Sequence, residues 1–188
     1  IILMIGANSL LAQKPTKNVT DVYTTEYAQD IINFLTQKKF QGREAGKKAS
    51  LPVVKFLKDE FIKIGCTVLI HTISDTDLLE AKGEPKQGTC YPKKIYNVIG
   101  KIEGLNKDKI VIIGAHFDHL GKKKGLGIHP GADDNASGIV SLLSLAKMIK
   151  ATGCTPKYTI FFCAWDGEEK GLLGSRYFVH NYYKNKSQ

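Results

Sequence analysis

The chain has 188 residues, 43% of them hydrophobic, and a formal net charge of +9 at neutral pH. That length and hydrophobic content are enough to bury one substantial core, so a single globular α/β domain is expected. The 18 glycines and 6 prolines are too few for a fibrous or low-complexity chain. The positive charge comes from scattered lysines, and the only arginines are Arg43 and Arg176. This disfavours nucleic acid as a partner, because nucleic-acid readers rely on arginine for bidentate contacts.

The chain opens with a short apolar stretch. Residues 1–12 are mostly apolar and end in small residues near Ala12, as at the end of a secretory signal peptide. The stretch is too short to span a bilayer, so no integral membrane segment is predicted. We expect a partial signal peptide at 1–12, a connector at 13–23, and export of the protein to a periplasmic or extracellular location. An N-terminal apolar strand is the alternative interpretation of the same residues.

The first half of the chain carries clear helix-end signals. Thr24 or Thr25 is available to cap a first helix, because a threonine oxygen accepts a hydrogen bond from the first turn. Pro52 suits the first turn of a second helix, and Gly65 suits its end. Together with the hydrophobic spacing, these signals predict helices over 25–38 and 50–65, a strand over 67–72 and an irregular polar loop over 74–92.

Strands and helices alternate in the second half of the chain. Residues 109–115 and 158–164 are continuous apolar runs, the pattern of strands covered on both faces, whereas 95–102 alternates like a half-buried strand. Helices are predicted over 135–150 and 172–183. A strand, helix, strand order implies parallel strands joined by a right-handed crossover. Such a crossover brings the ends of the two apolar strands to the same edge of the sheet.

Metal-binding residue types follow both apolar runs. His116 and Asp118 come directly after the first run, and Glu168 and Glu169 come shortly after the second. An aspartate pair, 133–134, opens the helix between them. Imidazole combined with carboxylates suits a hard divalent metal with some affinity for nitrogen, above all zinc. One of two adjacent glutamates can bind the ion while the other remains a general base, so the pattern predicts a metal-dependent hydrolase.

Each part of this pattern also has a purely structural interpretation. An aspartate before a helix can cap it, and we expect this of one residue of the pair Asp133 and Asp134, but not of both. Glu168 and Glu169 alone could form a solvated turn. Residues 122–124, three consecutive lysines between the motifs, are expected to form a solvated loop tip rather than a patch that steers substrate. The motifs become specific through their joint occurrence in this order.

These residues resemble the co-catalytic di-zinc aminopeptidases of metallopeptidase family twenty-eight, which include bacterial leucyl aminopeptidases. The similar segments are His116-Phe117-Asp118-His119-Leu120-Gly121, Gly131 to Gly138, Glu168 to Ser175, Phe40-Gln41-Gly42-Arg43 and Asn97-Val98-Ile99-Gly100. The resemblance thus spans residues 25–183. It implies a three-layer α/β/α sandwich with a mixed, mainly parallel central sheet, in which residues 24–188 form the N-terminal part of a single catalytic domain.

The resemblance also implies a role for each motif residue. The implied roles are metal ligand for His116, Asp134 and Glu169, general base for Glu168, orientation of His116 for Asp118, and support for Asp133 and Asn135. Asp134 would bridge two zinc ions, and the peptide bond between Asp134 and Asn135 would be cis. The family has a further aspartate ligand and a last histidine ligand with no counterpart in this sequence, so the chain is expected to be truncated at both ends.

The function expected of the intact protein is that of an exported zinc aminopeptidase. It would remove N-terminal residues from peptides by means of a metal-activated water and a glutamate general base. The alternatives are a carboxypeptidase or glutaminyl cyclase of the same fold, and a non-catalytic binding domain that retains the fold. A spare general base beside a metal ligand argues against a binding domain, because binding alone needs no base. Peptides are the expected partners, and the oligomeric state is left open.

Overall fold

A computed structural model describes residues 22–82 and 91–186. The predicted signal peptide and residues 13–21 of the predicted connector lie outside these ranges. None of the described helices is both long and apolar enough to cross a membrane. In chain order the main elements are α2 (Thr25–Leu35), α3 (Leu51–Ile64), β1 (Thr67–Ser74), α4 (Asp75–Lys82), β2 (Lys94–Ile102), β3 (Asn106–His116), β4 (Lys122–Lys123), β5 (Gly127–Ile128), α5 (Ser137–Ala151), β6 (Tyr158–Trp165) and α6 (Leu173–Lys186).

The central sheet has the strand order β1-β2-β6-β3 and is mixed. Strands β1 and β2 pair antiparallel, as do β2 and β6, whereas β3 and β6 pair parallel. Helix α5 connects β3 to β6, so the predicted parallel crossover is confirmed. In this register His116 lies opposite Trp165, and the two strands therefore end side by side.

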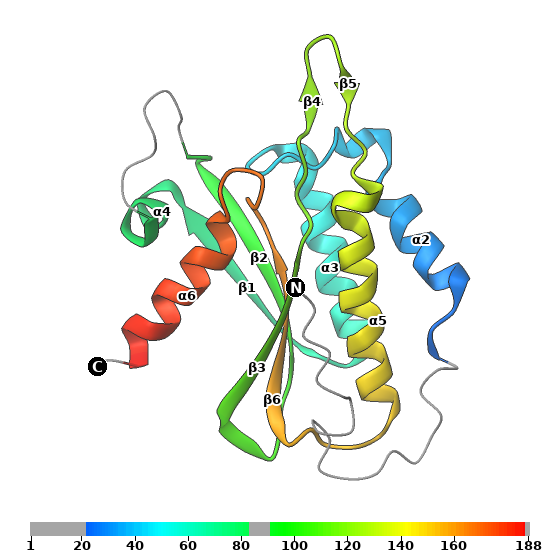
Figure 1. The fold of residues 1–188 in the computed structure, drawn as a ribbon, viewed down its shortest axis with the longest axis vertical. Coiled ribbons are helices and arrows are strands. Elements are labelled where there is room, and N and C mark those ends of the chain that lie inside the picture. The colour runs from blue at the N-terminus through cyan, green and yellow to red at the C-terminus, as the bar shows by residue number, and fades with distance from the viewer. Residues whose placement is uncertain (1–21, 83–90, 187–188) are drawn as a thin grey trace.

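Helices cover both faces of this sheet, which confirms the three-layer α/β/α architecture (Figure 1). Helices α2, α3 and α5 lie on one face, and α4 and α6 lie on the other. Because side chains alternate along a strand, neighbouring residues of β2 serve different layers. Val98 belongs to the larger core with α3 and α5, and Ile99 to a smaller core with Phe178 of α6. The short hairpin of β4 and β5 projects from one end of the molecule (Figure 1).

The predicted start of α2 and the predicted start and end of α3 are confirmed, whereas α2 ends at Leu35 and not at residue 38. Thr24 is the N-cap of α2, and its hydroxyl accepts a hydrogen bond from the backbone N–H of Tyr27 at 3.1 Å. Pro52 lies in the first turn of α3, where its missing N–H leaves no helical bond unmade. Gly65 ends α3 in the left-handed conformation with φ of 89°, which glycine adopts without steric cost.

Two predictions made from the sequence pattern are wrong. The polar residues 74–92 include helix α4, which begins with a capping box: Ser74 and Asp77 bind each other's backbone N–H. Strand β3 is not buried on both faces within the described residues, and none of its residues is fully buried. Val111 packs against the core beneath α5, but Ile112 faces the other way and is 44% exposed. An apolar run alone does not reveal whether a helix covers its second face.

The close approach of α3 to β2 gives a prediction for stability. Gly100 lies under Phe61, and a Cβ at residue 100 would come within 2.3 Å of the Phe61 ring. Gly100→Ala should therefore lower the free energy of unfolding by about 1–3 kcal/mol through overpacking. Phe61→Leu should also destabilise, yet it makes room for the new methyl group. In urea denaturation, the double variant should lose clearly less stability than the sum of the two single losses, and simple additivity would contradict this packing.

Candidate metal centre

The polar motifs meet at the edge of the sheet where β3 and β6 end. Beyond the last paired residues, the backbone N–H of Phe117 still donates to the carbonyl of Trp165 at 2.9 Å. This bond carries the parallel alignment into the loop that holds Asp118, and it places that loop beside the loop that holds Glu168 and Glu169. The carboxyl ends of parallel strands are where open α/β sheets bind ligands. The sheet therefore brings the motifs together as predicted.

His116 faces two of the predicted carboxylates. Its Nε2 lies 3.1 Å from Oδ1 of Asp134 and 3.9 Å from Oε2 of Glu168. Its Nδ1 lies 3.1 Å from the backbone oxygen of Asp118, a contact that directs Nε2 toward the other two residues. Burial lowers the pKa of His116, but the hydrogen bond and charge of Asp118 and the charge of Glu168 raise it more, so the net shift is upward. The imidazole thus lies in a strongly anionic environment that suits a cation.

Asp118 is fully buried and mainly contacts the backbone of the glutamate loop. Its two carboxylate oxygens accept hydrogen bonds from the N–H groups of Glu168 and Glu169 at 3.0 and 3.3 Å. The distance from Oδ1 to Nδ1 of His116 is 3.7 Å, longer than a hydrogen bond. Asp118 therefore positions the two glutamates directly, while its backbone carbonyl makes the closer contact to His116.

A second histidine, which sequence reasoning left without a role, joins the centre. His119, Asp134 and Glu169 each offer one ligand atom, and these atoms all lie within 4.8 Å of one another. An imidazole with two carboxylates is a donor set that fits zinc. The side chain of Asp134 is 62% exposed and close to both His116 and His119. The spacing of three residues between the two histidines was the available signal, because it places both in one short loop.

The aspartate pair does not cap α5. Instead, Oδ1 of Asn135 accepts the backbone N–H of Gly138 at 3.0 Å, which corrects the expectation that one aspartate would do so. Asp133 is exposed, and its backbone oxygen accepts a hydrogen bond from the hydroxyl of Ser137. The Asp134–Asn135 peptide bond is cis, as the family resemblance implies. Asn135 thus supports the start of the helix and leaves Asp134 available to the centre.

Arg43 connects the loops of the centre from beneath. The side chain is fully buried and donates to four carbonyl oxygens, at distances of 2.6–2.8 Å. These oxygens belong to Leu35, Phe117, Pro130 and Gly131. Burial lowers its pKa to about 10, against the favourable charges of two aspartates of the centre, so Arg43 remains cationic at neutral pH. Sequence reasoning noted Arg43 only as part of a matching segment, since nothing in its neighbours predicts full burial.

Asp166 is a buried carboxyl group next to the centre that sequence reasoning also missed. Burial and the nearby charge of Asp118 raise its pKa to about 8, although the backbone N–H groups of Tyr96 and Gly167 bind it and oppose this shift. Its own backbone N–H donates to Asn97, whose amide in turn donates to the carbonyl of Gly174. This chain of bonds ties the end of β6 to β2 and to α6.

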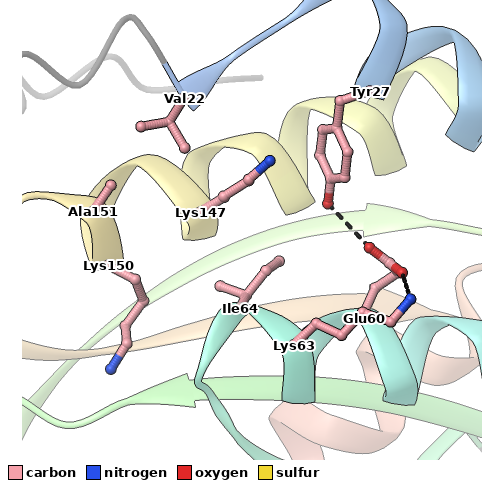
Figure 2. A pocket seen from close by; sticks show the side chains of 8 residues that line it. All are labelled: Val22, Tyr27, Glu60, Lys63, Ile64, Lys147, Lys150 and Ala151. Carbon is pink, nitrogen blue, oxygen red and sulfur yellow. Dashed lines mark hydrogen bonds and ion pairs between the residues drawn. The ribbon is translucent and has the colours of Figure 1, made fainter.

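A cavity of about 440 Å³ lies away from the metal centre, between α2, α3 and α5 (Figure 2). In it Tyr27 donates to Glu60 at 3.3 Å, and the ammonium of Lys147 lies 4.1 Å from the centre of the Tyr27 ring. The cavity is at the carboxyl end of α5, whereas Asp134 lies before its amino end. The Figure 2 cavity therefore does not contribute to the metal centre.

The fold is a three-layer α/β/α sandwich, and imidazole and carboxylate side chains meet at the carboxyl ends of its parallel strands. This combination of fold and site is typical of metallohydrolases. The family model described as Peptidase family M28 matches residues 97–188. Through these residues the chain belongs to peptidase family M28, which confirms the resemblance inferred from the motifs.

The similarity to curated relatives covers part of this chain and a smaller part of each relative. The chain is 42% identical over 91 residues to the "Probable glutamate carboxypeptidase" of Arthroderma benhamiae, covering 47% of this chain and 12% of that protein. It is 31% identical over 137 residues to "Leupeptin-inactivating enzyme 1" of Streptomyces exfoliatus, covering 73% of this chain and 26% of that protein. It is 35% identical over 94 residues to "Aminopeptidase Y" of Saccharomyces cerevisiae, covering 50% of this chain and 16% of that protein.

Solved structures share the fold. The Legionella pneumophila LapA aminopeptidase matches with a TM-score of 0.66 and 22% identity, over 89% of this chain and 41% of that chain. The zinc aminopeptidase BSAP from Bacillus subtilis matches with a TM-score of 0.63 and 16% identity, over 82% of this chain and 64% of that chain. At these identities the matches establish the α/β/α architecture alone.

The burial of Arg43 predicts a large effect on stability. Arg43→Met should lower the free energy of unfolding by at least about 3 kcal/mol, because four carbonyl groups lose their donor, three of them in buried contacts. Arg43→Lys should recover part of this loss, since an ammonium retains the charge but presents its donors from a single point. Arg176→Met, at the exposed second arginine of the chain, is the matched control and should be nearly neutral. Similar denaturation curves for Arg43→Met and Arg176→Met would contradict this interpretation.

Asp166 predicts a pH dependence of stability. Its carboxyl group keeps its proton up to about pH 8 in the folded protein, whereas the unfolded chain loses this proton near the ordinary aspartate pKa of about 4. The free energy of unfolding of the metal-free protein should therefore fall as pH rises between these values, by up to about 1.4 kcal/mol per pH unit from this group. Urea denaturation from pH 5 to pH 8 should show a shallower fall for Asp166→Asn. An unchanged slope would show that Asp166 does not carry this dependence.

Proposed function

We propose that this protein is an exported zinc aminopeptidase. The observation that carries the proposal is the convergence of His116, Asp134, Glu168 and Glu169 at one edge of the sheet. Membership of peptidase family M28 and the aminopeptidases among the relatives support peptide hydrolysis. Export rests on the signal-like residues 1–12 alone.

His116, Asp134 and Glu169 would hold the metal. Asp134 lies near both other proposed ligands, since Oδ1 lies 3.1 Å from Nε2 of His116 and its ligand atom lies within 4.8 Å of that of Glu169. This placement supports a bridging role for Asp134 between two zinc ions. When bound, zinc would supply a Lewis acid that polarises the scissile carbonyl and lowers the pKa of a water molecule.

Glu168 would serve as the general base. Its backbone is fixed by Asp118, while its side chain is 36% exposed and approaches His116 only to 3.9 Å. A carboxylate with its backbone fixed and its side chain open to solvent is suited to take a proton from water. The same group can then return the proton to the amine that leaves, which requires no second acid.

A carboxypeptidase is the second candidate, and one relative favours it. The protein named "Probable glutamate carboxypeptidase" is 42% identical over 91 residues. Both activities use the same metal chemistry, and they differ in whether the free amine or the free carboxylate of the peptide is bound. Leucyl arylamide and N-blocked dipeptides separate them. Chelator-sensitive hydrolysis of the arylamide supports the aminopeptidase, and hydrolysis of the N-blocked dipeptide alone supports the carboxypeptidase.

The assigned roles predict opposite phenotypes for two adjacent glutamates. Glu168→Gln should lower kcat for the arylamide by at least about 100-fold, because the base is lost, while zinc content stays near that of the unaltered protein. Glu169→Gln should instead lower zinc content, measured by atomic absorption after dialysis. A loss of zinc in Glu168→Gln with retention in Glu169→Gln would mean that the two roles are exchanged.

A further inference from the structure

We propose that His119 is a positioning residue, which holds the carboxylate of Glu169 in the orientation that binds metal. The inference deepens the proposed metal centre and rests on it. Nδ1 of His119 lies 2.7 Å from Oε1 of Glu169, the length of a strong hydrogen bond. An ionised carboxylate only accepts hydrogen bonds, so Nδ1 must carry the proton. A nitrogen that donates this proton has no lone pair left for a metal ion, so Nε2 is the only nitrogen of His119 that could still bind one.

The ring of His119 is itself held in place on several sides. Its backbone N–H donates to the carbonyl of Arg43 at 3.2 Å. Its Cδ2 atom lies against Gly131, where an added Cβ would come within 2.7 Å of the ring. The side chain is only 10% exposed. The donor is therefore fixed before Glu169 meets it, and the hydrogen bond costs little further loss of side-chain freedom.

Glu169 needs such a partner because its side chain has several free rotations. The backbone is fixed, since its N–H donates to Oδ2 of Asp118 at 3.3 Å, but this leaves the carboxylate free to turn. Ordering a glutamate side chain costs conformational entropy. His119 orders it in the absence of metal, through one carboxylate oxygen, and leaves the second oxygen available. Partners of this kind typically contribute about 10- to 100-fold to metal affinity.

The two histidines of the loop thus have different roles, since His116 faces the metal centre as a ligand and His119 positions Glu169. His116 directs Nδ1 at a backbone carbonyl and leaves Nε2 facing Asp134 and Glu168, as a ligand requires. His119 directs Nδ1 at a carboxylate side chain.

Asparagine provides a discriminating substitution at residue 119. Its amide nitrogen occupies nearly the position of Nδ1, so His119→Asn keeps the donor but offers no imidazole. His119→Leu removes both. By isothermal titration calorimetry, His119→Leu should weaken zinc binding by about 10- to 100-fold, and His119→Asn should recover most of this loss. The visible spectrum of the cobalt-substituted protein should be the same for the unaltered protein and His119→Asn, because no ligand is exchanged.

Two results would overturn the proposed role of His119. A cobalt spectrum that changes in His119→Asn would make His119 a metal ligand and overturn the proposal, as would zinc affinity in His119→Leu equal to that of the unaltered protein. His180→Leu, which removes an imidazole from α6, is the control and should leave affinity unchanged. Thermal unfolding of the metal-free variants reports any general loss of structure. Failure of the unaltered protein to bind zinc would instead contradict the proposed metal function itself.

Discussion

The parallel pairing of β3 with β6 is the constraint on which the candidate centre depends. It aligns His116 with Trp165, and the bond from Phe117 to Trp165 continues the alignment into both loops. Because side chains alternate across a strand, a shift of one residue in this register would turn His116 to the opposite face of the sheet. The distances between the imidazole and the carboxylates are therefore set by backbone hydrogen bonds that lie outside the centre.

Buried polar side chains convert that alignment into a defined geometry. Asp118 binds the backbone of the glutamate loop. Arg43 binds the carbonyl of Phe117, which lies between the two histidines, and the carbonyl of Gly131, which lies shortly before Asp134. Both side chains are fully buried, where an unpaired polar group is costly, and every nitrogen of the guanidinium and both oxygens of the carboxylate make a hydrogen bond. This makes alternative loop conformations unfavourable, because each would leave a charge or several carbonyl groups without partners. The side chains of the proposed ligands His116, Asp134 and Glu169 remain partly open to solvent.

The sequence predicted helix ends correctly where the conformation depends on neighbouring residues. Thr24, Pro52 and Gly65 mark helix ends because their own backbone preferences and short-range hydrogen bonds decide the conformation. Burial was less predictable. The apolar run of β3 resembles a strand covered on both sides, yet Ile112 is exposed, since coverage depends on where distant helices pack. Likewise the side chain that binds the first turn of α5 is Asn135 rather than an aspartate, and the backbone of residues 134 and 135 is not helical.

The sequence by itself determined the order of the sheet strands and of the helices other than α4, the parallel crossover, and the residue types that meet at the edge of the sheet. It did so because helix caps, hydrophobic spacing and motif order are properties of neighbouring residues. Only the tertiary structure decided the roles of Arg43, Asp166 and His119. Their importance comes from burial and from partners far away in the chain, such as the 50 residues that separate His119 from Glu169. Contacts of that kind exist only once the sheet has formed.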